Sequence, residues 1–305
     1  MSGPTSTFKT PLFPLIVDVA RCSFHDGPGI RSVVFFKGCR LQCPLCHNPE
    51  TQKPWPEIAF FRNKCIECHS CIEACPHHAL NFDLDHPIIK QKCNNCGKCS
   101  DVCPSGALHL FGRYYSVETL TELLAKDLSF YQSSGGGVTL SGGECALYPH
   151  YLNKLMKRLE QLGIHIIIET SGYFDYEKFE NLVLPYVDMI YFDIKFADPA
   201  LHELYCGKTN NRILDNLVKL IAKIPSRIQP RFPIFPGIND TDQNLNQVRL
   251  LLDKLGQKRI EILPYNPTGT YKYEGLGRPT PKAPNEFTSA VELSRIQKYL
   301  SQDAK

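Results

Sequence analysis

The placement of cysteine constrains this chain more than any other feature of its sequence. The 305 residues include fourteen cysteines, and eleven of them fall between Cys39 and Cys103 in tight groups. Disulfide scaffolds spread their cysteines through small secreted chains, whereas neighbours this close suit ligation of one metal centre. The pattern therefore predicts intracellular metal ligation rather than a disulfide framework.

An internal repeat accounts for eight of these cysteines. Cys65, Cys68, Cys71 and Cys75 return 28 residues later as Cys93, Cys96, Cys99 and Cys103, and a proline follows the fourth cysteine in both copies. A fixed period of this kind indicates two copies of one supersecondary unit. We therefore expect residues 54–112, called the insert below, to form a separate cysteine-rich domain.

Outside the insert, short β-rich runs alternate with amphipathic helical segments. The runs are SVVFF (32–36), GVTL (137–140), HIIIET (165–170), MIYFDIK (189–195), RFPIF (231–235) and RIEIL (259–263). Helical faces are expected over 152–162 and 245–255, with Ser116 as the N-cap of another helix. Apolar strands separated by helices favour a parallel sheet covered by helices. The sequence thus predicts an α/β fold, a partial (β/α)6 TIM-like barrel over 15–53 and 113–305, with ligands bound at the C-terminal strand ends.

The first cysteine group has the spacing C-x3-C-x2-C and directly follows the first of these runs. Three thiolates, from Cys39, Cys43 and Cys46, suit three irons of a 4Fe–4S cube and leave the fourth iron open to a substrate. A structural zinc site with His47 as the fourth ligand is the alternative. That alternative leaves the neighbouring repeat unexplained, because the repeat is a poor zinc pattern.

This group resembles the signature of the radical S-adenosylmethionine enzymes, with Leu45 in the apolar position before the last cysteine. The resemblance implies that the open iron binds the amino and carboxylate groups of S-adenosylmethionine. An electron from the cluster then cleaves the sulfonium to give methionine and a 5′-deoxyadenosyl radical, which abstracts hydrogen. Cys39, Cys43 and Cys46 are the catalytic residues in this interpretation.

The similarity narrows to the glycyl radical enzyme activating enzymes, typified by the pyruvate formate-lyase activating enzyme, over nearly the whole chain. It rests on HDGPGIRSVVFFKGC (25–39), CHNPE (46–50), SSGGGVTLSGGE (133–144), ETSG (169–172), FDIK (192–195), RFPIFPGIND (231–240) and LPYNPTG (263–269). The resemblance implies that the radical takes a hydrogen atom from a backbone glycine of a partner glycyl radical enzyme.

The same resemblance implies a pocket for S-adenosylmethionine at the strand ends. Its predicted cofactor-binding residues are Leu45, Cys46, His47, Gly142, Gly143, Glu144, Thr170, Asp193, Ile194, Lys195, Arg231 and Asn266. Asn266 stands where the pyruvate formate-lyase type has histidine, so only a binding role transfers to it. Glu169 and Thr170 resemble part of a monovalent-cation site. A buried Asp193–Lys195 ion pair and a surface Arg231 are the structural alternatives.

The repeated C-x2-C-x2-C-x3-C-P pattern is that of bacterial two-cluster ferredoxins, in which the fourth cysteine of each run ligates the other cluster. One 4Fe–4S cluster is then expected on Cys65, Cys68, Cys71 and Cys103, and another on Cys93, Cys96, Cys99 and Cys75. With the catalytic cluster, the chain would bind three. We expect the ferredoxin-like insert to relay electrons from a flavodoxin or ferredoxin donor. A domain that only stabilises the fold or docks the partner is the alternative.

The net charge and the hydropathy of the chain limit its expected partners and location. The net charge of +3 is nearly balanced, so neither nucleic acid nor a membrane surface is an expected partner. No apolar run approaches the ~20 residues that span a bilayer, and no signal-peptide pattern is present, so we expect a cytoplasmic protein. A radical enzyme acting on a small molecule and a plain electron carrier are the alternatives. A carrier needs neither the three-cysteine motif nor a barrel.

Overall fold

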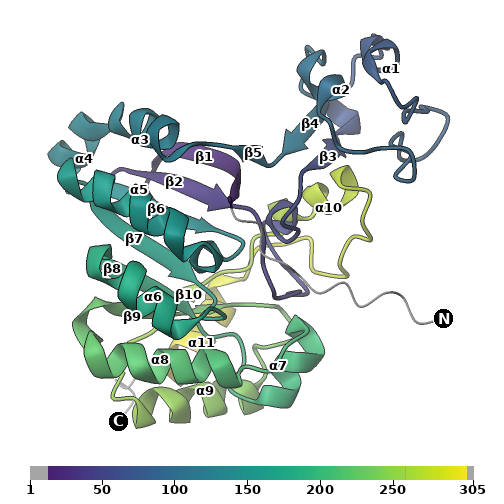
Figure 1. Cartoon of the computed structure of the whole chain (residues 1–305). Coiled ribbons are helices and arrows are strands. Elements are labelled where there is room, and N and C mark those ends of the chain that lie inside the picture. Colours follow the sequence, from purple (N-terminus) through teal and green to yellow (C-terminus); the bar gives the residue numbers. More distant parts are fainter. Residues whose placement is uncertain (1–12, 258, 301–305) are drawn as a thin grey trace.

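The computed structural model describes residues 13–257 and 259–300, so the last five residues of the predicted barrel domain lie outside it. Within these ranges the strands form one eight-stranded sheet, in the order β10-β9-β8-β7-β6-β2-β1-β5, and one two-stranded sheet of β3 and β4 (Figure 1). The strands of the large sheet are β1 (Leu15–Ser23), β2 (Arg31–Phe36), β5 (Arg113–Tyr114), β6 (Gly137–Gly142), β7 (His165–Thr170), β8 (Met189–Asp193), β9 (Ile228–Pro233) and β10 (Glu261–Leu263).

Six strands of the large sheet, β2, β6, β7, β8, β9 and β10, are parallel to one another. They are the six runs predicted from the sequence, so the prediction of a parallel-dominated α/β sheet is confirmed. The boundaries differ at β9, predicted at 231–235 but observed at Ile228–Pro233. Pro233 has no N–H for the ladder, and the Phe235 amide donates instead to Oδ1 of Asn239.

Helices follow the parallel strands, and Figure 1 shows α5, α6 and α8 in a row over the sheet. They are α3 (Val117–Ala125), α4 (Leu128–Ser134), α5 (Pro149–Gln161), α6 (Tyr176–Leu182), α7 (Pro199–Cys206), α8 (Asn211–Lys223), α9 (Asp242–Lys254), α10 (Tyr271–Gly275) and α11 (Ala290–Leu300). The predicted faces over 152–162 and 245–255 lie in α5 and α9. Ser116 caps α3 by accepting from the Thr119 amide at 3.1 Å, as predicted.

The sequence reasoning missed β1 and β5. Both pair antiparallel at the edge beyond β2, where β1 is mostly half-buried or exposed and carries no run of buried apolar residues. An edge strand with this pattern gives little periodic signal. Because β5 has only two residues, it gives none.

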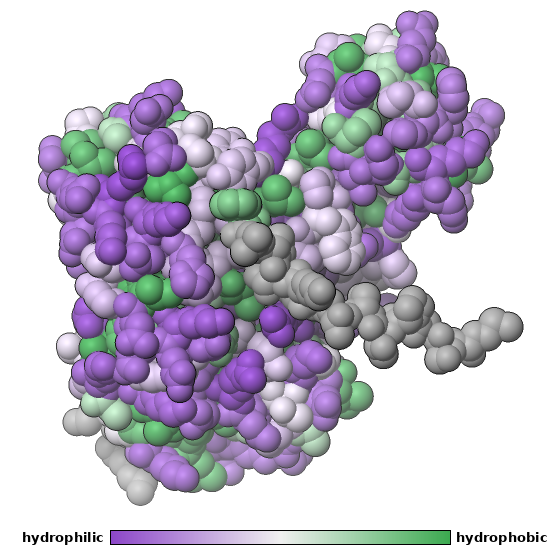
Figure 2. All heavy atoms as spheres, in the orientation of Figure 1, coloured by the Kyte–Doolittle hydropathy of each residue, from purple (hydrophilic) through white to green (hydrophobic). Residues whose placement is uncertain are grey.

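The insert contains β3 (Glu57–Phe60), β4 (Leu108–Phe111) and two short helices, α1 (Ser70–Ala74) and α2 (Lys98–Asp101). β3 and β4 pair antiparallel and pack over a small core of their own. The 28-residue repeat extends to the backbone, because three left-handed positions recur at that spacing: Glu67 and Asn95, His69 and Gly97, His78 and Gly106. Figure 2 shows the insert as a mostly hydrophilic lobe that projects from the body.

None of the helices in the described ranges combines the length and apolar character that crossing a bilayer would require.

Candidate functional site

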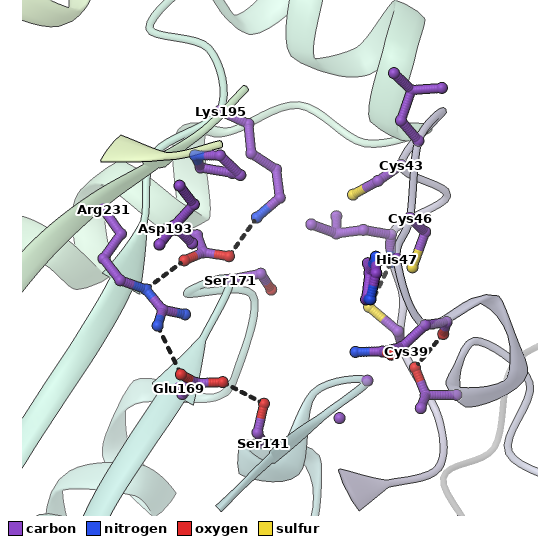
Figure 3. A pocket seen from close by; sticks show the side chains of 18 of the residues that line it. Cys39, Cys43, Cys46, His47, Ser141, Glu169, Ser171, Asp193, Lys195 and Arg231 are labelled. Atoms are coloured by element: carbon purple, nitrogen blue, oxygen red, sulfur yellow. Dashed lines mark hydrogen bonds and ion pairs between the residues drawn. The ribbon is translucent and has the colours of Figure 1, made fainter. Parts of the chain in front are cut away.

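A cavity of about 480 Å³ lies at the C-terminal ends of the parallel strands. One wall comes from the ends of β6, β7, β8 and β9, and the facing wall comes from the loop 39–52, called the cluster loop below (Figure 3). Ligands of parallel α/β sheets bind at this edge. The predicted location of the site therefore agrees with the cavity.

Three thiols of the cluster loop, those of Cys39, Cys43 and Cys46, line this cavity and are partly buried. The loop is fixed by backbone bonds, since the Cys39 amide donates to the Gln52 carbonyl at 2.9 Å. Burial raises the pKa of Cys46 to about 12 and raises that of Cys39 as well. A hydrogen bond from the Cys206 thiol, together with the ammonium of Lys195, lowers the pKa of Cys43.

The arrangement of these three thiols bears on whether they hold a single metal ion or the predicted 4Fe–4S cluster. In the described part of the chain, no three His, Cys, Asp or Glu side chains are arranged to hold one metal ion. A 4Fe–4S cube differs from a single ion because it takes each thiolate on a different iron. Three thiols on one side of a single cavity, without a fourth cysteine lining it, fit such a cube with one iron free of protein ligands.

Four charged side chains face the thiols from the strand ends (Figure 3). Arg231 on β9 reaches across β8 and pairs with Glu169 of β7 at 2.6 Å, and its Nε lies 3.2 Å from Asp193. Lys195 pairs with the other oxygen of Asp193 at 3.2 Å. The guanidinium also stacks 4.9 Å from the ring centre of Tyr191. The network contains two acids and two bases, so it is neutral when all four are ionised.

Burial and mutual attraction act in opposite directions on the pKa values of this network. Burial raises the pKa of Asp193, but Lys195 and Arg231 lower it further, so the net shift is downward. For Lys195 and Arg231 burial lowers the pKa, and the carboxylates raise it by more. For Glu169 burial outweighs the attraction of Arg231, and its pKa is raised. An ammonium has three donors, and Asp193 accepts one from Lys195. The cation beside Cys43 can therefore pair with an anionic ligand.

The glycines that end β6 are required by backbone contacts. Gly142 has φ +107°, a left-handed conformation that favours glycine. A Cβ added at Gly143 would lie 2.4 Å from the carbonyl oxygen of Gly38 and 2.8 Å from that of Thr51. Gly143 was predicted to bind the cofactor and lines the cavity; in the structure its backbone also lies close to that of Gly38 and Thr51.

Two predicted pocket residues, Glu144 and Ile194, do not line the cavity. The Glu144 side chain is completely buried and accepts from the hydroxyls of Thr170 and Ser171 and from the Ser171 amide, so it joins the ends of β6 and β7. Ile194 is 1% exposed and packs in the main core. Ile194 directly follows Asp193, which lines the cavity, and neighbouring side chains of an extended segment point to opposite faces. Glu144 lies beyond the end of β6 and caps the turn Cys145–Leu147.

All the other predicted pocket residues line the cavity, together with residues that were not predicted. The cavity is lined by the predicted Leu45, Cys46, His47, Gly142, Gly143, Thr170, Asp193, Lys195, Arg231 and Asn266. Asn266 is exposed, and its amide oxygen accepts from Thr268. Ser141 also lines the cavity but was not predicted, and Ser171, from the ETSG segment at the predicted ligand-binding edge, lines it as well. Ser141 donates to Glu169, a signal available only when the register of β6 and β7 is known.

The eight cysteines of the insert form two groups that cross the repeat. Cys65, Cys68, Cys71 and Cys103 line one small cavity. Cys93 and Cys99 interact electrostatically with Cys75 and Cys96. The fourth cysteine of each run thus lies with the first three of the other run. All fourteen cysteines are in the described residues, and each is free.

Known proteins resemble this chain over most of its length. A family model described as the Radical SAM superfamily matches residues 33–247. The trans-4-hydroxy-L-proline dehydratase activating enzyme of Clostridioides difficile is 38% identical over 93% of this chain and 97% of its own length. The (2S)-3-sulfopropanediol dehydratase activating enzyme of Klebsiella oxytoca is 39% identical over 87% and 86%. In fold, the chain is similar to Streptococcus suis SuiB bound to precursor peptide SuiA, with a TM-score of 0.50 and 12% identity over 86% of this chain and 43% of that one.

Proposed function

Because the chain belongs to the radical S-adenosylmethionine superfamily, among the activating enzymes of glycyl radical enzymes, we propose how its residues perform that activation. The activity is reductive cleavage of S-adenosylmethionine, followed by removal of a hydrogen atom from a backbone glycine of a partner enzyme. The observation that supports the residue assignment best is the placement of three thiols on one wall of the cavity and four charged side chains on the other.

We assign Cys39, Cys43 and Cys46 as ligands of the catalytic 4Fe–4S cluster. When bound, the cluster supplies one electron for cleavage of the sulfonium, and the cofactor supplies the 5′-deoxyadenosyl radical. The protein encloses and orients these groups. The cluster loop fixes the three thiols, and Gly143 keeps the end of β6 against that loop.

The charged wall is assigned to binding of S-adenosylmethionine. Lys195 holds its positive charge because Asp193 pairs with it, and it is the cation that would pair with the methionine carboxylate. Arg231 is fixed by Glu169 and Asp193 and keeps the wall rigid at the strand ends. The monovalent cation at Glu169 and Thr170 stays a prediction, because Glu169 accepts from Arg231 and Ser141, and Thr170 donates to Glu144.

We further propose that the six parallel strands form a partial barrel and that the insert is a ferredoxin-like domain with two 4Fe–4S clusters. The crossed grouping of its cysteines supports ligation by Cys65, Cys68, Cys71 and Cys103 in one cluster and by Cys93, Cys96, Cys99 and Cys75 in the other. These clusters would relay electrons from a flavodoxin or ferredoxin. The proposed compartment is the cytoplasm, where thiols stay reduced.

The test uses anaerobically reconstituted, reduced protein with S-adenosylmethionine, and the measured product is 5′-deoxyadenosine. Cys43→Ala should abolish product while the insert keeps its iron. The control is Cys22→Ala, because Cys22 is exposed and lies outside all three cysteine groups; it should cleave at the unaltered rate. A trans-4-hydroxy-L-proline dehydratase is the first partner to test, and it should acquire a glycine-centred electron spin resonance doublet. Product from Cys43→Ala would contradict the assignment. Cleavage without a doublet on any partner would favour a small-molecule substrate.

A further inference from the structure

Residues 271–278, called the tie segment below, lie between the insert and the cluster loop. Figure 1 shows α10, which forms most of this segment, beside β3 at the base of the projecting lobe. The Tyr273 hydroxyl donates to the Cys46 carbonyl at 3.2 Å. Lys272 pairs with the buried carboxylate of Glu50 at 2.7 Å. The tie segment therefore bonds directly to Cys46, a proposed cluster ligand, and to Glu50 further along the cluster loop.

The same segment packs against the insert. A Cβ added at Gly275 would lie 2.7 Å from the ring of Phe61, so the two surfaces are in close contact. The imidazole of His86 lies 3.0 Å from the Gly275 carbonyl oxygen, and Lys90 donates to the carbonyl of Gly277 at 2.5 Å. Three residues from two separate parts of the insert thus contact one short segment of the body.

Two positive charges, one from the tie segment and one from the end of β2 just before the cluster loop, converge on a carboxylate of the insert, that of Glu57. This residue begins β3 and is 8% exposed. Arg278 of the tie segment donates to both of its oxygens, at 2.6 and 2.8 Å, and also to the Pro49 carbonyl. Lys37, fully buried and two residues before Cys39, pairs with Glu57 at 2.9 Å. A bidentate arginine and a second buried cation give this junction a fixed geometry.

We propose that Glu57, through Arg278, Lys37 and the tie segment, is a positioning residue that holds the insert at a fixed separation from the cluster loop for electron transfer. The inference rests on the proposed function, because it takes the insert as the electron relay and the cluster loop as the seat of the catalytic cluster. Electron tunnelling falls steeply with separation, so a rigid junction matters more for this step than for the cleavage itself. The junction makes no contact with the charged wall of the cavity in the described residues.

The experiment compares the unaltered, cluster-loaded enzyme with Glu57→Gln. Both are reduced with dithionite, freed of reductant and mixed with S-adenosylmethionine, and 5′-deoxyadenosine is measured by rapid quench. The first equivalent uses the electron already on the catalytic cluster, and later equivalents need electrons from the insert. Glu57→Gln should leave the first phase unchanged and slow the later phase by roughly tenfold or more, as small misplacements do. The matched control is Lys53→Met, because Lys53 touches the same carboxylate at 3.3 Å but is 46% exposed; both of its phases should be unchanged.

A second variant leaves the buried charged residues of the junction with their partners. Gly275→Ala pushes on Phe61 at the same junction and should also slow only the later phase, with iron content unchanged. A later phase at the unaltered rate in both variants would overturn the inference. Equal slowing of both phases would also overturn it, because that indicates general structural damage. If the unaltered enzyme gives no product at all, the proposed function fails, and the inference that rests on it fails with it.

Discussion

Replacement of Arg231 by glutamine tests whether the charged wall holds together as an ion-pair network. Arg231 is 7% exposed and is the partner of both Glu169 and Asp193. Glutamine keeps hydrogen-bonding capacity but no charge. Asp193 then retains Lys195, whereas Glu169 retains only the Ser141 hydroxyl among the partners that the structure gives it. The substitution thus strands about one buried negative charge.

The size of the effect follows from that stranded charge. Removal of one partner from a buried ion pair costs about 3–5 kcal/mol. We therefore expect Arg231→Gln to lower the free energy of unfolding by about 3 kcal/mol, and Tm by about 5–10 °C for a chain of this size. The assay is anaerobic thermal denaturation of the cluster-loaded protein, followed by circular dichroism. Arg158→Gln, which breaks an exposed pair with Glu118, is the control and should change stability by less than about 0.5 kcal/mol.

A double variant separates charge from packing. Arg231→Gln with Glu169→Gln removes the stranded carboxylate, so it should regain about 1–2 kcal/mol relative to Arg231→Gln alone. A double variant no more stable than the single one would refute the reasoning. So would an Arg231→Gln protein as stable as the exposed control.

Three further predictions concern other parts of the chain. A hydrogen bond from Arg21 holds the pKa of Asp127 below its ordinary value, so the contribution of this carboxylate to stability is present above about pH 3.9 and is lost as the pH falls below it. Asp127→Asn should therefore lower Tm at pH 7 and flatten the acid limb of a Tm–pH curve, and an unchanged limb would contradict this. His78 is exposed and has φ +45°, at the position where the other copy of the repeat has Gly106. His78→Gly should therefore raise the free energy of unfolding, measured in denaturant, by about 1 kcal/mol. A lower free energy of unfolding would show that the histidine side chain contributes more than the backbone strain costs. Gly143→Ala places a Cβ against the Gly38 carbonyl. It should lower the free energy of unfolding by about 1–3 kcal/mol and lower the iron content of the catalytic site. Normal iron content together with a normal Tm would contradict the close approach.

The fold could be predicted from sequence wherever its signal is local. The parallel strands are short apolar runs, the helix after Ser116 begins with an ordinary cap, and the 28-residue repeat is visible in the spacing of cysteines alone. The cavity could be predicted because strand ends of a parallel sheet share one edge. Each of these features depends on residues close together in the chain.

The remainder depends on register and on contacts between distant segments. Arg231 meets Glu169 across an intervening strand, 62 residues away, which no periodicity indicates. Glu57 meets Arg278 across 221 residues, so nothing in the sequence marked it as a junction between the insert and the cluster loop. Glu144 was expected in the pocket, but it lies beyond the end of β6, where its carboxylate caps the turn Cys145–Leu147 and accepts from Thr170 and Ser171 at the end of the neighbouring strand.

Transfer of hydrogen from the partner to the cofactor tests the central claim most directly. A glycyl radical enzyme partner is labelled with glycine deuterated at its α-carbon and mixed with the reduced protein and S-adenosylmethionine, and the 5′-deoxyadenosine is analysed by mass spectrometry. The account predicts deuterium in the product from the unaltered enzyme and no product from Cys43→Ala. Unlabelled 5′-deoxyadenosine from every partner tested, formed at the full rate while the partners remain free of glycyl radical, would contradict it.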